Sequence, residues 1–253
     1  MGKIIAVANQ KGGVGKTTTA VNLAAALTLR GKRALLCDSD PQANATSGLG
    51  IPRDSSRKGI YEGLLGEAAV RDLIVHTDFC DVLPSAIALA GAELELADQP
   101  QREYRLKNLL RPAAFDYDFI LIDCPPSVSL LTVNALVAAD SVLIPLQCEY
   151  YALEGLSDLM NTMRAVKRRL NPEISMFGVL LTMFDGRTNF SNQVAQEVRR
   201  HFPGKVFTSV IPRNIRLSEA PSHGKPVQAY DRSSRGATAY NGLAKEIIKK
   251  EGL

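Results

Sequence analysis

The stretch that most constrains this chain is glycine-rich: Lys11-Gly12-Gly13-Val14-Gly15-Lys16-Thr17-Thr18. The apolar run at residues 4–8 before it predicts a buried strand, and the pattern of residues 20–29 after it predicts a helix. In a strand, loop and helix of this order, the backbone N–H groups of the loop and the positive N-terminus of the helix converge on an anion. We therefore expect the loop to cradle the phosphates of a nucleotide.

The side chains of this loop add specific chemistry. Lys16 can reach the β- and γ-phosphates as a point charge, and the Thr17 hydroxyl is placed to bind Mg²⁺. The strict pattern G-x-x-x-x-G-K-[ST] is not met, because Gln10 occupies its first glycine position and a second lysine, Lys11, stands at the loop entrance. The residues expected to hold the nucleotide are Lys11, Gly12, Gly13, Val14, Gly15, Lys16, Thr17 and Thr18.

Lys11 needs a separate explanation, because Lys16 already serves the phosphates of its own chain. Phosphoryl transfer depends mainly on positioning and on neutralising charge, which Lys16, Mg²⁺ and the loop amides supply. A second lysine can act on the nucleotide of a neighbouring subunit, as an arginine finger does in trans. Dimerisation would then be a condition of hydrolysis.

Carboxylates follow two further strand-like runs. Asp38-Ser39-Asp40-Pro41-Gln42 ends the run at residues 33–38, and Asp123 ends the run at 119–123. Asp123 has the form of a carboxylate that holds Mg²⁺ directly or through water. Asp38 and Asp40 are separated by one residue, so on an extended chain they point the same way. One of them orients the attacking water while the other supports the metal shell or the loop, or either aspartate only caps a turn.

The rest of the chain alternates strand-like and helix-like segments. Further strands are expected at residues 81–84, 141–145, 176–183 and 206–211. Further helices are expected at 61–65, 69–74, 86–96, 102–114, 130–138, 153–170, 192–201 and 234–250, with a long surface loop at 43–58. This alternation predicts a single α/β domain over residues 1–253, with a mostly parallel twisted sheet and helices on both faces. Ligands of such sheets bind at the carboxyl ends of the strands.

Composition excludes several other classes of protein. The chain has 253 residues and 45% hydrophobic content, which suits one globular domain. No apolar run approaches the ~18 residues of a membrane span, and the N-terminus has no signal-peptide pattern. The four cysteines show no C-x-x-C spacing. Cys37 and Cys124 lie in apolar runs, which indicates core thiols in a reducing cytoplasm rather than a metal or iron–sulfur site.

Three motifs together carry a resemblance to a known family. Residues 11–18, Asp38-Ser39-Asp40-Pro41-Gln42 and Ile122-Asp123-Cys124-Pro125-Pro126-Ser127 resemble the deviant Walker A ATPases, which have the P-loop NTPase fold. Within that group the chain is similar to the ParA/Soj chromosome-partitioning proteins over nearly its whole length. Further matching stretches are Glu149-Tyr150-Tyr151-Ala152-Leu153-Glu154-Gly155, Met183-Phe184-Asp185-Gly186-Arg187-Thr188 and Ile211-Pro212-Arg213-Asn214-Ile215-Arg216-Leu217-Ser218-Glu219-Ala220-Pro221-Ser222.

The resemblance implies an ATP-dependent molecular switch. In this family, ATP and Mg²⁺ sandwich two subunits into a homodimer, and the dimer binds DNA without sequence preference. A centromere-binding partner, ParB, stimulates slow ATP hydrolysis and so releases the ATPase from DNA. The chain is accordingly expected to be a cytoplasmic, nucleoid-associated ATPase that partitions a chromosome or plasmid, without binding a membrane.

Roles for the nucleotide-site residues follow from the same resemblance. Lys11 would be the signature lysine that crosses the dimer interface, and Lys16 would be the phosphate lysine. Thr17 would be the Mg²⁺ ligand, and Asp123 would complete the outer shell of the metal. Asp40 would serve hydrolysis.

The C-terminal third matches the family in two further places. Pro212 and Asn214 match the segment that contacts adenine, and Arg187 and Arg216 match arginines implicated in DNA binding. Residues 187–253 carry 12 Lys/Arg and 5 Asp/Glu, whereas residues 1–186 carry 18 and 21. This basic excess agrees with a footprint for a polyanion, although a solvated face of scattered charge has the same composition.

Two local features bear on how far the resemblance extends. Ala43 stands where the family usually has glycine, and a positive φ there would strain the loop. Only residues 1–3 precede the first expected strand, so we expect no N-terminal helix-turn-helix extension of the kind that larger plasmid-type members carry.

The nearest alternative is a MinD-like membrane-associated positioning ATPase, which binds lipid through a C-terminal amphipathic helix. Here residues 243–253 form an apolar stripe without Phe or Trp, and two acidic residues lie among the lysines. Such a stripe is expected to pack on its own domain. An electron carrier of the nitrogenase iron protein type would need cluster motifs that Cys80 and Cys124 lack, and a small-molecule kinase or ligase would need a substrate pocket.

Overall fold

β1 (Lys3–Val7), the strand that leads into the glycine-rich loop, lies inside a seven-stranded sheet of order β3-β4-β2-β5-β1-β6-β7. The computed structural model describes residues 1–53, 57–149 and 152–253, and the sheet lies within these ranges. Its pairings are parallel except the antiparallel one between β3 and β4. The predicted mostly parallel sheet is therefore confirmed. The remaining strands are β2 (Ala34–Asp38), β3 (Val75–His76), β4 (Asp81–Leu83), β5 (Phe119–Asp123), β6 (Ser141–Gln147) and β7 (Ser175–Thr182).

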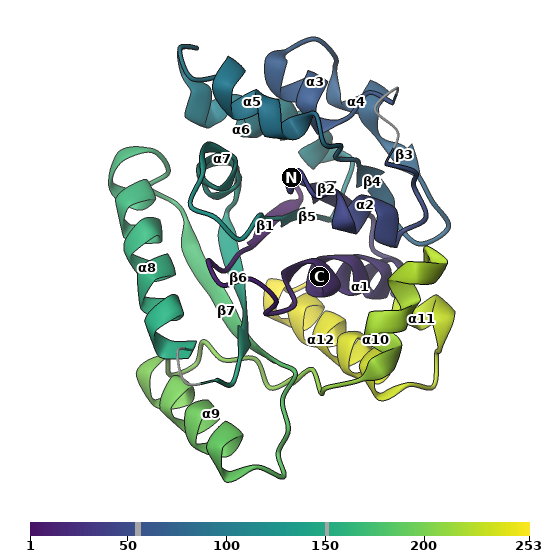
Figure 1. Cartoon of the computed structure of the whole chain (residues 1–253), viewed down its shortest axis with the longest axis vertical. Helices are drawn as coiled ribbons and strands as arrows, with labels where there is room; N and C mark the ends of the chain where they lie inside the picture. Colours follow the sequence, from purple (N-terminus) through teal and green to yellow (C-terminus); the bar gives the residue numbers. More distant parts are fainter. Residues whose placement is uncertain (54–56, 150–151) are drawn as a thin grey trace.

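Both faces of the sheet are covered, as the alternation of side chains along β1 shows. Ile4 and Ala6 belong to one apolar cluster, together with helices α3 to α9, and Ile5 and Val7 belong to a second cluster, together with α1 and α12. Figure 1 shows these two groups of helices on opposite sides of the sheet. A strand buried on both faces reads as a continuous apolar run, which is why the strands were visible in the sequence.

The helices have the following bounds. The first group is α3 (Ile60–Leu65), α4 (Val70–Leu73), α5 (Leu89–Glu95), α6 (Arg105–Leu110), α7 (Leu130–Ala138), α8 (Ala152–Arg169) and α9 (Asn189–His201). The second group is α1 (Lys16–Thr28), α2 (Asn44–Gly48), α10 (Ile215–Glu219), α11 (Val227–Tyr230) and α12 (Arg235–Glu251). Short 3₁₀ turns are η1 (Arg102–Tyr104), η2 (Ala113–Phe115) and η3 (Ala220–His223). The predicted helix over 102–114 is thus three short elements, and β3, α10 and α11 were not predicted.

The C-terminal helix α12 packs on its own domain, as its sequence pattern predicted. Tyr240, Leu243 and Ile247 are buried in the cluster that includes α1. The Tyr240 hydroxyl also lies 3.1 Å from the Thr19 hydroxyl of α1, so the helix is tied to the element that follows the glycine-rich loop. The apolar stripe of α12 is therefore used inside the fold. Among the described residues, no helix is both long and apolar enough to cross a membrane.

The surface loop predicted at residues 43–58 is partly wrong, because it contains the short helix α2. Ala43 is the N-cap residue of this helix and supplies no side-chain cap. The carboxylate of Asp38 takes that place, accepting hydrogen bonds from the backbone N–H of Thr46 at 2.8 Å and from its hydroxyl at 2.7 Å. A capping group that comes from a preceding strand leaves no local sequence signal. Residues 54–56 of the predicted loop lie outside the described part of the chain.

The strand predicted at residues 206–211 is also wrong as a regular strand. Its backbone pairs with β7 at isolated points and not as a continuous ladder. The Phe207 N–H donates to the Val179 carbonyl at 2.9 Å, and the Ile211 N–H donates to the Leu181 carbonyl at 2.9 Å. Between these points, the N–H groups of Thr208 and Ser209 donate instead to the Glu246 carboxylate of α12, at 2.7 and 2.9 Å. The contact with α12 therefore interrupts the ladder.

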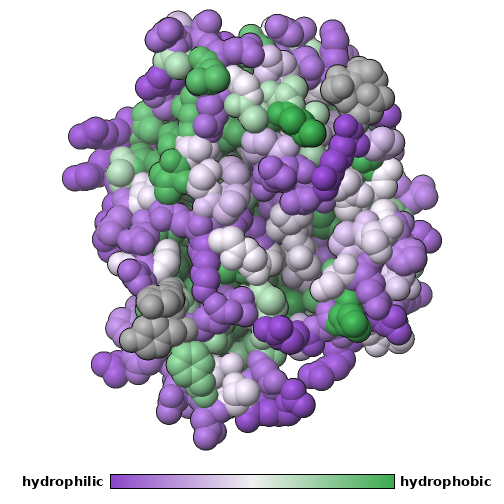
Figure 2. Space-filling view, in the orientation of Figure 1, coloured by the Kyte–Doolittle hydropathy of each residue, from purple (hydrophilic) through white to green (hydrophobic). Residues whose placement is uncertain are grey.

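The long helices α8 and α9 are amphipathic and lie at the surface. Leu156, Leu159, Met163 and Val166 form the buried side of α8. Figure 2 shows hydrophilic residues along the left and lower edges of the molecule, where α8 and α9 lie in Figure 1. Cys37, Cys80, Cys124 and Cys148 are buried free thiols, and burial raises the pKa of each. The expectation of core thiols is therefore confirmed for Cys37 and Cys124.

Candidate nucleotide-binding site

The glycine-rich loop connects β1 to α1 and opens at the carboxyl edge of the sheet. Gly13 and Gly15 have φ of +73° and +89°, a conformation that a residue with a Cβ adopts only with strain. Gly15 is the N-cap of α1, and no side chain of the described residues caps this helix end. The first-turn N–H groups of α1 are therefore available to an anion. The Thr182 hydroxyl, from the end of β7, donates to the Val14 carbonyl at 2.8 Å and so ties the loop to this strand.

Lys16 lies inside the loop. Its ammonium donates to the Lys11 carbonyl at 3.0 Å, and the residue is only 7% exposed. Burial lowers the pKa of Lys16, and the nearby Asp123 and Asp40 carboxylates oppose that shift. A buried ammonium at this position can neutralise the charge of an anionic ligand bound by the loop.

Lys11 points away from the loop interior and pairs with Glu149, two residues after β6. Its backbone N–H donates to the Asn9 side chain at 3.0 Å. The two charged side chains are 37% and 43% exposed, so water screens their attraction. The structure therefore separates the two lysines, with Lys16 inside the loop and Lys11 at its rim. Tyr150 and Tyr151, which belong to the stretch matching the family after Glu149, lie outside the described residues.

Asp123 supplies a carboxylate that fits a cation. It is fully buried, and within the described residues neither carboxylate oxygen has a hydrogen-bond partner. Burial and the nearby Asp38 raise its pKa well above the ordinary value, while the Thr17 hydroxyl and the Lys16 ammonium act in the opposite direction. A pair of orphaned carboxylate oxygens beside a threonine hydroxyl matches the hard oxygen ligands that Mg²⁺ prefers. These residues fit Mg²⁺, which usually keeps several waters and phosphate ligands and needs few protein groups.

Asp38 and Asp40, which the sequence left as alternatives, occupy different environments. Asp38 is fully buried and accepts hydrogen bonds from Asp40 and from the backbone and hydroxyl of Thr46. Burial raises the pKa of Asp38 to about 6, against the lowering effect of these hydrogen bonds. Asp40 lines the nucleotide cavity, and one of its oxygens accepts from the Gln42 N–H at 2.9 Å. Asp38 thus supports the turn, and Asp40 faces the cavity.

The cavity beside the loop has a volume of about 570 Å³. Ligand pockets commonly measure roughly 300–1,000 Å³, so this volume admits a nucleotide. Residues 12, 13 and 15–18 of the loop line it, and so do Pro212 and Asn214, together with Met183, Ile211 and Leu217. The structure therefore brings the predicted phosphate and adenine segments to one cavity. The Asn214 side chain also accepts from the Arg216 N–H at 2.9 Å, which fixes it at the start of α10.

Two backbone conformations near this cavity are strained. Ala43 has φ of +50°, so the condition under which alanine would strain this loop is met. Met183, which lines the cavity after β7, has φ of +47°. Residues with a Cβ are held in this conformation only where the surrounding structure enforces it, and such residues cluster at functional sites.

Arg187 follows β7 and is the more exposed of the two predicted DNA-binding arginines. It pairs with Asp185 at 2.7 Å, and this contact holds the pKa of Asp185 at about 2. Arg187 lines a groove with a volume of about 750 Å³. Arg213 and Arg235 line this groove as well. Three arginines therefore line one groove, together with the Asp185 carboxylate that pairs with Arg187.

Arg216 lies on the separate short helix α10. Its guanidinium contacts Glu219 at 2.8 Å and Asp231 at 3.3 Å. It does not line the groove of Arg187. The structure therefore places both arginines at the surface, each beside a carboxylate of its own chain, and does not bring them to one groove.

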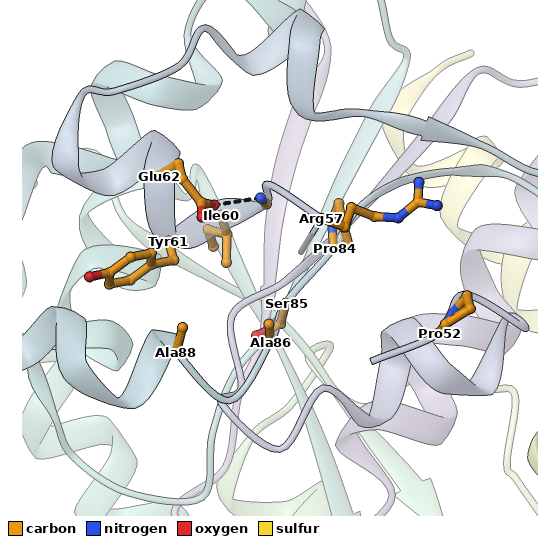
Figure 3. Close-up of a pocket in the computed structure, with 10 residues that line it drawn as sticks. Pro52, Arg57, Ile60, Tyr61, Glu62, Pro84, Ser85, Ala86 and Ala88 are labelled. Atoms are coloured by element: carbon orange, nitrogen blue, oxygen red, sulfur yellow. Dashed lines mark hydrogen bonds between the residues drawn. The ribbon is translucent and has the colours of Figure 1, made fainter. Parts of the chain in front are cut away.

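Another, much smaller hollow lies at the start of α3 (Figure 3) and is too small to be a substrate site. Its volume is about 20 Å³, which suits about one water molecule. Ser85 is one of the residues that line it, and the dashed line in Figure 3 marks the hydrogen bond from the Gly59 N–H to the Glu62 carboxylate. This hollow is a packing gap behind the turn that carries Asp40.

Sequence reasoning missed Thr182, Met183 and Tyr240, all of which line the nucleotide cavity. Thr182 and Met183 end a strand that was predicted, so the rule that ligands bind at the carboxyl ends of strands could have identified them. Tyr240 lies in the last helix, and only the packing of α12 on α1 brings it to the site.

The fold and the site together define a P-loop nucleotide-binding protein. The profile of the family AAA_31, described as an AAA domain, matches residues 2–176. The sporulation initiation inhibitor protein Soj of Bacillus subtilis (strain 168) is 59% identical over 249 residues, which cover 98% of each chain. The chromosome partitioning protein ParA of Myxococcus xanthus (strain DK1622) is 55% identical over 253 residues, 99% of this chain and 89% of that one. The chain belongs to the Soj/ParA family of chromosome-partitioning ATPases.

A solved structure agrees with this assignment at the level of the fold. Cobyrinic acid a,c-diamide synthase from Mycobacterium smegmatis, solved with a bound ATP analogue and magnesium, has a TM-score of 0.87 and 38% identity. The match covers 100% of this chain and 98% of the other. The P-loop fold predicted from the sequence is therefore confirmed.

Proposed function

We propose that this chain is an ATP-dependent dimerising switch that partitions a chromosome or plasmid. The observation that carries the proposal is the buried Asp123 carboxylate, whose oxygens have no partner among the described residues, beside Lys16 and Thr17. ATP and Mg²⁺ are the cofactors that satisfy these groups. The phosphates would lie on the loop and the N-terminus of α1, and adenine between Pro212, Asn214 and their apolar neighbours.

In this proposal, hydrolysis depends on four residues at the nucleotide site: Lys16, Thr17, Asp40 and Asp123. Thr17 would hold Mg²⁺, with Asp123 in its outer shell, and the bound ion would supply positive charge to the phosphates. Lys16 adds a positive charge from inside the loop, where its low exposure strengthens the interaction. Asp40 faces the cavity and orients the attacking water. These residues would thus bind the triphosphate and orient it for attack by water.

Dimerisation gives Lys11 its role. Its side chain stands at the rim of the loop, where it can leave Glu149 and reach the nucleotide of a second copy of this chain. A lysine supplied in trans makes hydrolysis depend on the dimer. The ATP-bound dimer then binds nonspecific DNA through arginines that include Arg187 and Arg216, and a ParB-type partner stimulates hydrolysis and release. This cycle would place the protein in the cytoplasm, on the nucleoid.

Light scattering during size-exclusion chromatography, with hydrolysis measured in parallel, tests this proposal. The wild type should elute as a dimer with ATP and Mg²⁺ and as a monomer with ADP. Lys16→Ala should lose ATP binding, whereas Lys11→Ala should still bind ATP and lose hydrolysis. A chain that hydrolyses ATP equally well as a strict monomer, or that keeps full activity without Lys11, would contradict the proposal.

A further inference from the structure

A closed ring of hydrogen bonds holds the backbone of Asp40 at both ends. The Asp40 N–H donates to Asp38 at 3.2 Å, and the Asp40 carbonyl accepts from the Ser85 hydroxyl at 2.7 Å. Asp38 accepts from the Thr46 hydroxyl at 2.7 Å, and that hydroxyl accepts from the Ser85 N–H at 2.9 Å. The four residues come from the end of β2, the turn after it, α2 and the loop after β4. The ring therefore joins three segments of the chain around one aspartate.

The ring is sealed from water. Asp38 and Thr46 are 0% exposed, Ser85 is 4% exposed and Asp40 is 7% exposed. Removing one hydroxyl from such a network leaves its partner unsatisfied in the protein interior, and water cannot readily replace it. Each of the two hydroxyl groups therefore affects the position of the whole turn.

The Ser85 side of the ring is itself anchored to the start of α3 (Figure 3). The Pro84 carbonyl accepts from the Ile60 N–H at 2.9 Å. A Cβ added to Gly59 would lie 2.4 Å from the same carbonyl oxygen, so the two backbones are in close contact. Glu62 accepts from the Gly59 N–H at 2.6 Å and fixes that turn in place. Ser85 is thus a fixed point against which Asp40 is held.

The orientation of the ring connects it to hydrolysis. Asp40 lines the nucleotide cavity, whereas Thr46 and Ser85 do not. We propose that Thr46 and Ser85 are positioning residues, whose hydroxyl groups fix the Asp40 backbone so that its carboxylate meets the attacking water. This inference rests on the proposed role of Asp40 in hydrolysis. Catalytic groups must be held within about 0.5 Å of their productive position, and a displacement of about 1 Å can lower a rate about 100-fold.

Steady-state hydrolysis by Thr46→Val and Ser85→Ala tests the inference. The kcat for ATP should fall about tenfold in each, because Asp40 loses its fixed position, while KM stays within about twofold. Thr46→Ser, which keeps the hydroxyl, should restore kcat. The matched controls are Ser141→Ala, which removes a buried hydroxyl without a hydrogen-bond partner among the described residues, and Thr28→Val on α1. Both should retain the wild-type kcat.

A double-mutant comparison separates positioning from general destabilisation. In an Asp40→Asn background, Thr46→Val and Ser85→Ala should cause no further loss of kcat, because they act through Asp40. An equal loss in that background would overturn the inference. The inference would also be overturned if Asp40→Asn lowers kcat while Thr46→Val and Ser85→Ala both keep the wild-type kcat. If Asp40→Asn hydrolyses ATP as the wild type does, the proposed role of Asp40 fails and this inference fails with it. Ser85→Ala carries the test alone if Thr46→Val does not fold.

Discussion

The ammonium of Lys11 pairs with the carboxylate of Glu149 at the rim of the nucleotide loop, so the lysine expected to cross a dimer interface is held within its own chain. The two side chains are 37% and 43% exposed, and an ion pair of this exposure contributes about 0.2–1 kcal/mol. Dimerisation in which Lys11 reaches a second nucleotide must break this pair. The pair therefore favours the monomer by a small amount.

Glu149→Gln should accordingly strengthen ATP-dependent dimerisation. Each subunit contributes one Lys11–Glu149 pair, so a dimer breaks two of them. Removing two competitors worth about 0.2–1 kcal/mol each lowers the dimer dissociation constant about 2- to 30-fold. Sedimentation equilibrium with ATP and Mg²⁺ measures the change, and Glu173→Gln, at an exposed position before β7, is the matched control for charge. A weaker dimer in Glu149→Gln would show instead that Glu149 serves the dimer itself.

Asp123→Asn should stabilise the ligand-free protein at neutral pH and remove its response to Mg²⁺. The buried Asp123 carboxylate has no partner among the described residues, and an unsatisfied buried group destabilises the fold by about 1–3 kcal/mol. Its folded pKa lies well above the ordinary 3.8, so its favourable contribution is present at low pH and is lost as pH rises through the raised value. The advantage of Asp123→Asn should therefore grow with pH.

Chemical denaturation at about pH 5 and about pH 8 measures this difference, with and without Mg²⁺ and ATP. Asp98→Asn, which makes the same substitution at an exposed position, is the matched control. A difference that shrinks as pH rises would contradict the assignment of Asp123 as a buried carboxylate with a raised pKa.

Ala43→Gly should stabilise the turn between β2 and α2. Ala43 has φ of +50°, which strains a residue with a Cβ by about 1–2 kcal/mol, while glycine adds roughly 0.5–1 kcal/mol of entropic cost. The net gain should be about 0.5–1 kcal/mol, visible as a rise in Tm of about 1–4 °C. Ala45→Gly, within α2, should instead lower the free energy of unfolding by about 1 kcal/mol. A lower Tm in Ala43→Gly would show that the Ala43 methyl group, which is fully buried, outweighs the strain.

The sequence predicted those parts of the site that depend on local order along the chain. Lys16 and Thr17 belong to one loop, and Asp123 ends an apolar run, so their meeting at the carboxyl edge of a parallel sheet followed from the fold class. The difference between Asp38 and Asp40 did not follow. Thr46, from another segment, donates two hydrogen bonds to the Asp38 carboxylate. Ser85 donates to the backbone carbonyl of Asp40, so the Asp40 carboxylate still faces the cavity.

The misjudged elements have the same cause. α2 forms where Asp38 caps it from the preceding strand, and residues 206–211 leave the sheet where Glu246 of α12 takes two of their N–H groups. Both are contacts between distant segments, which apolar periodicity does not encode. Local patterns therefore predicted the elements, and tertiary hydrogen bonds determined their exact form at these two places.

Co-sedimentation with nonspecific DNA and, in parallel, with anionic liposomes tests the central claim most directly. The wild type should bind DNA with ATP and not with ADP, and binding should weaken steeply as salt rises, because phosphate contacts release counterions. Lys16→Ala and Arg216→Glu should lose this binding, whereas Arg168→Glu, the same charge change on the exposed side of α8, should keep it. Liposome binding without DNA binding would contradict the account and identify a membrane-positioning ATPase instead.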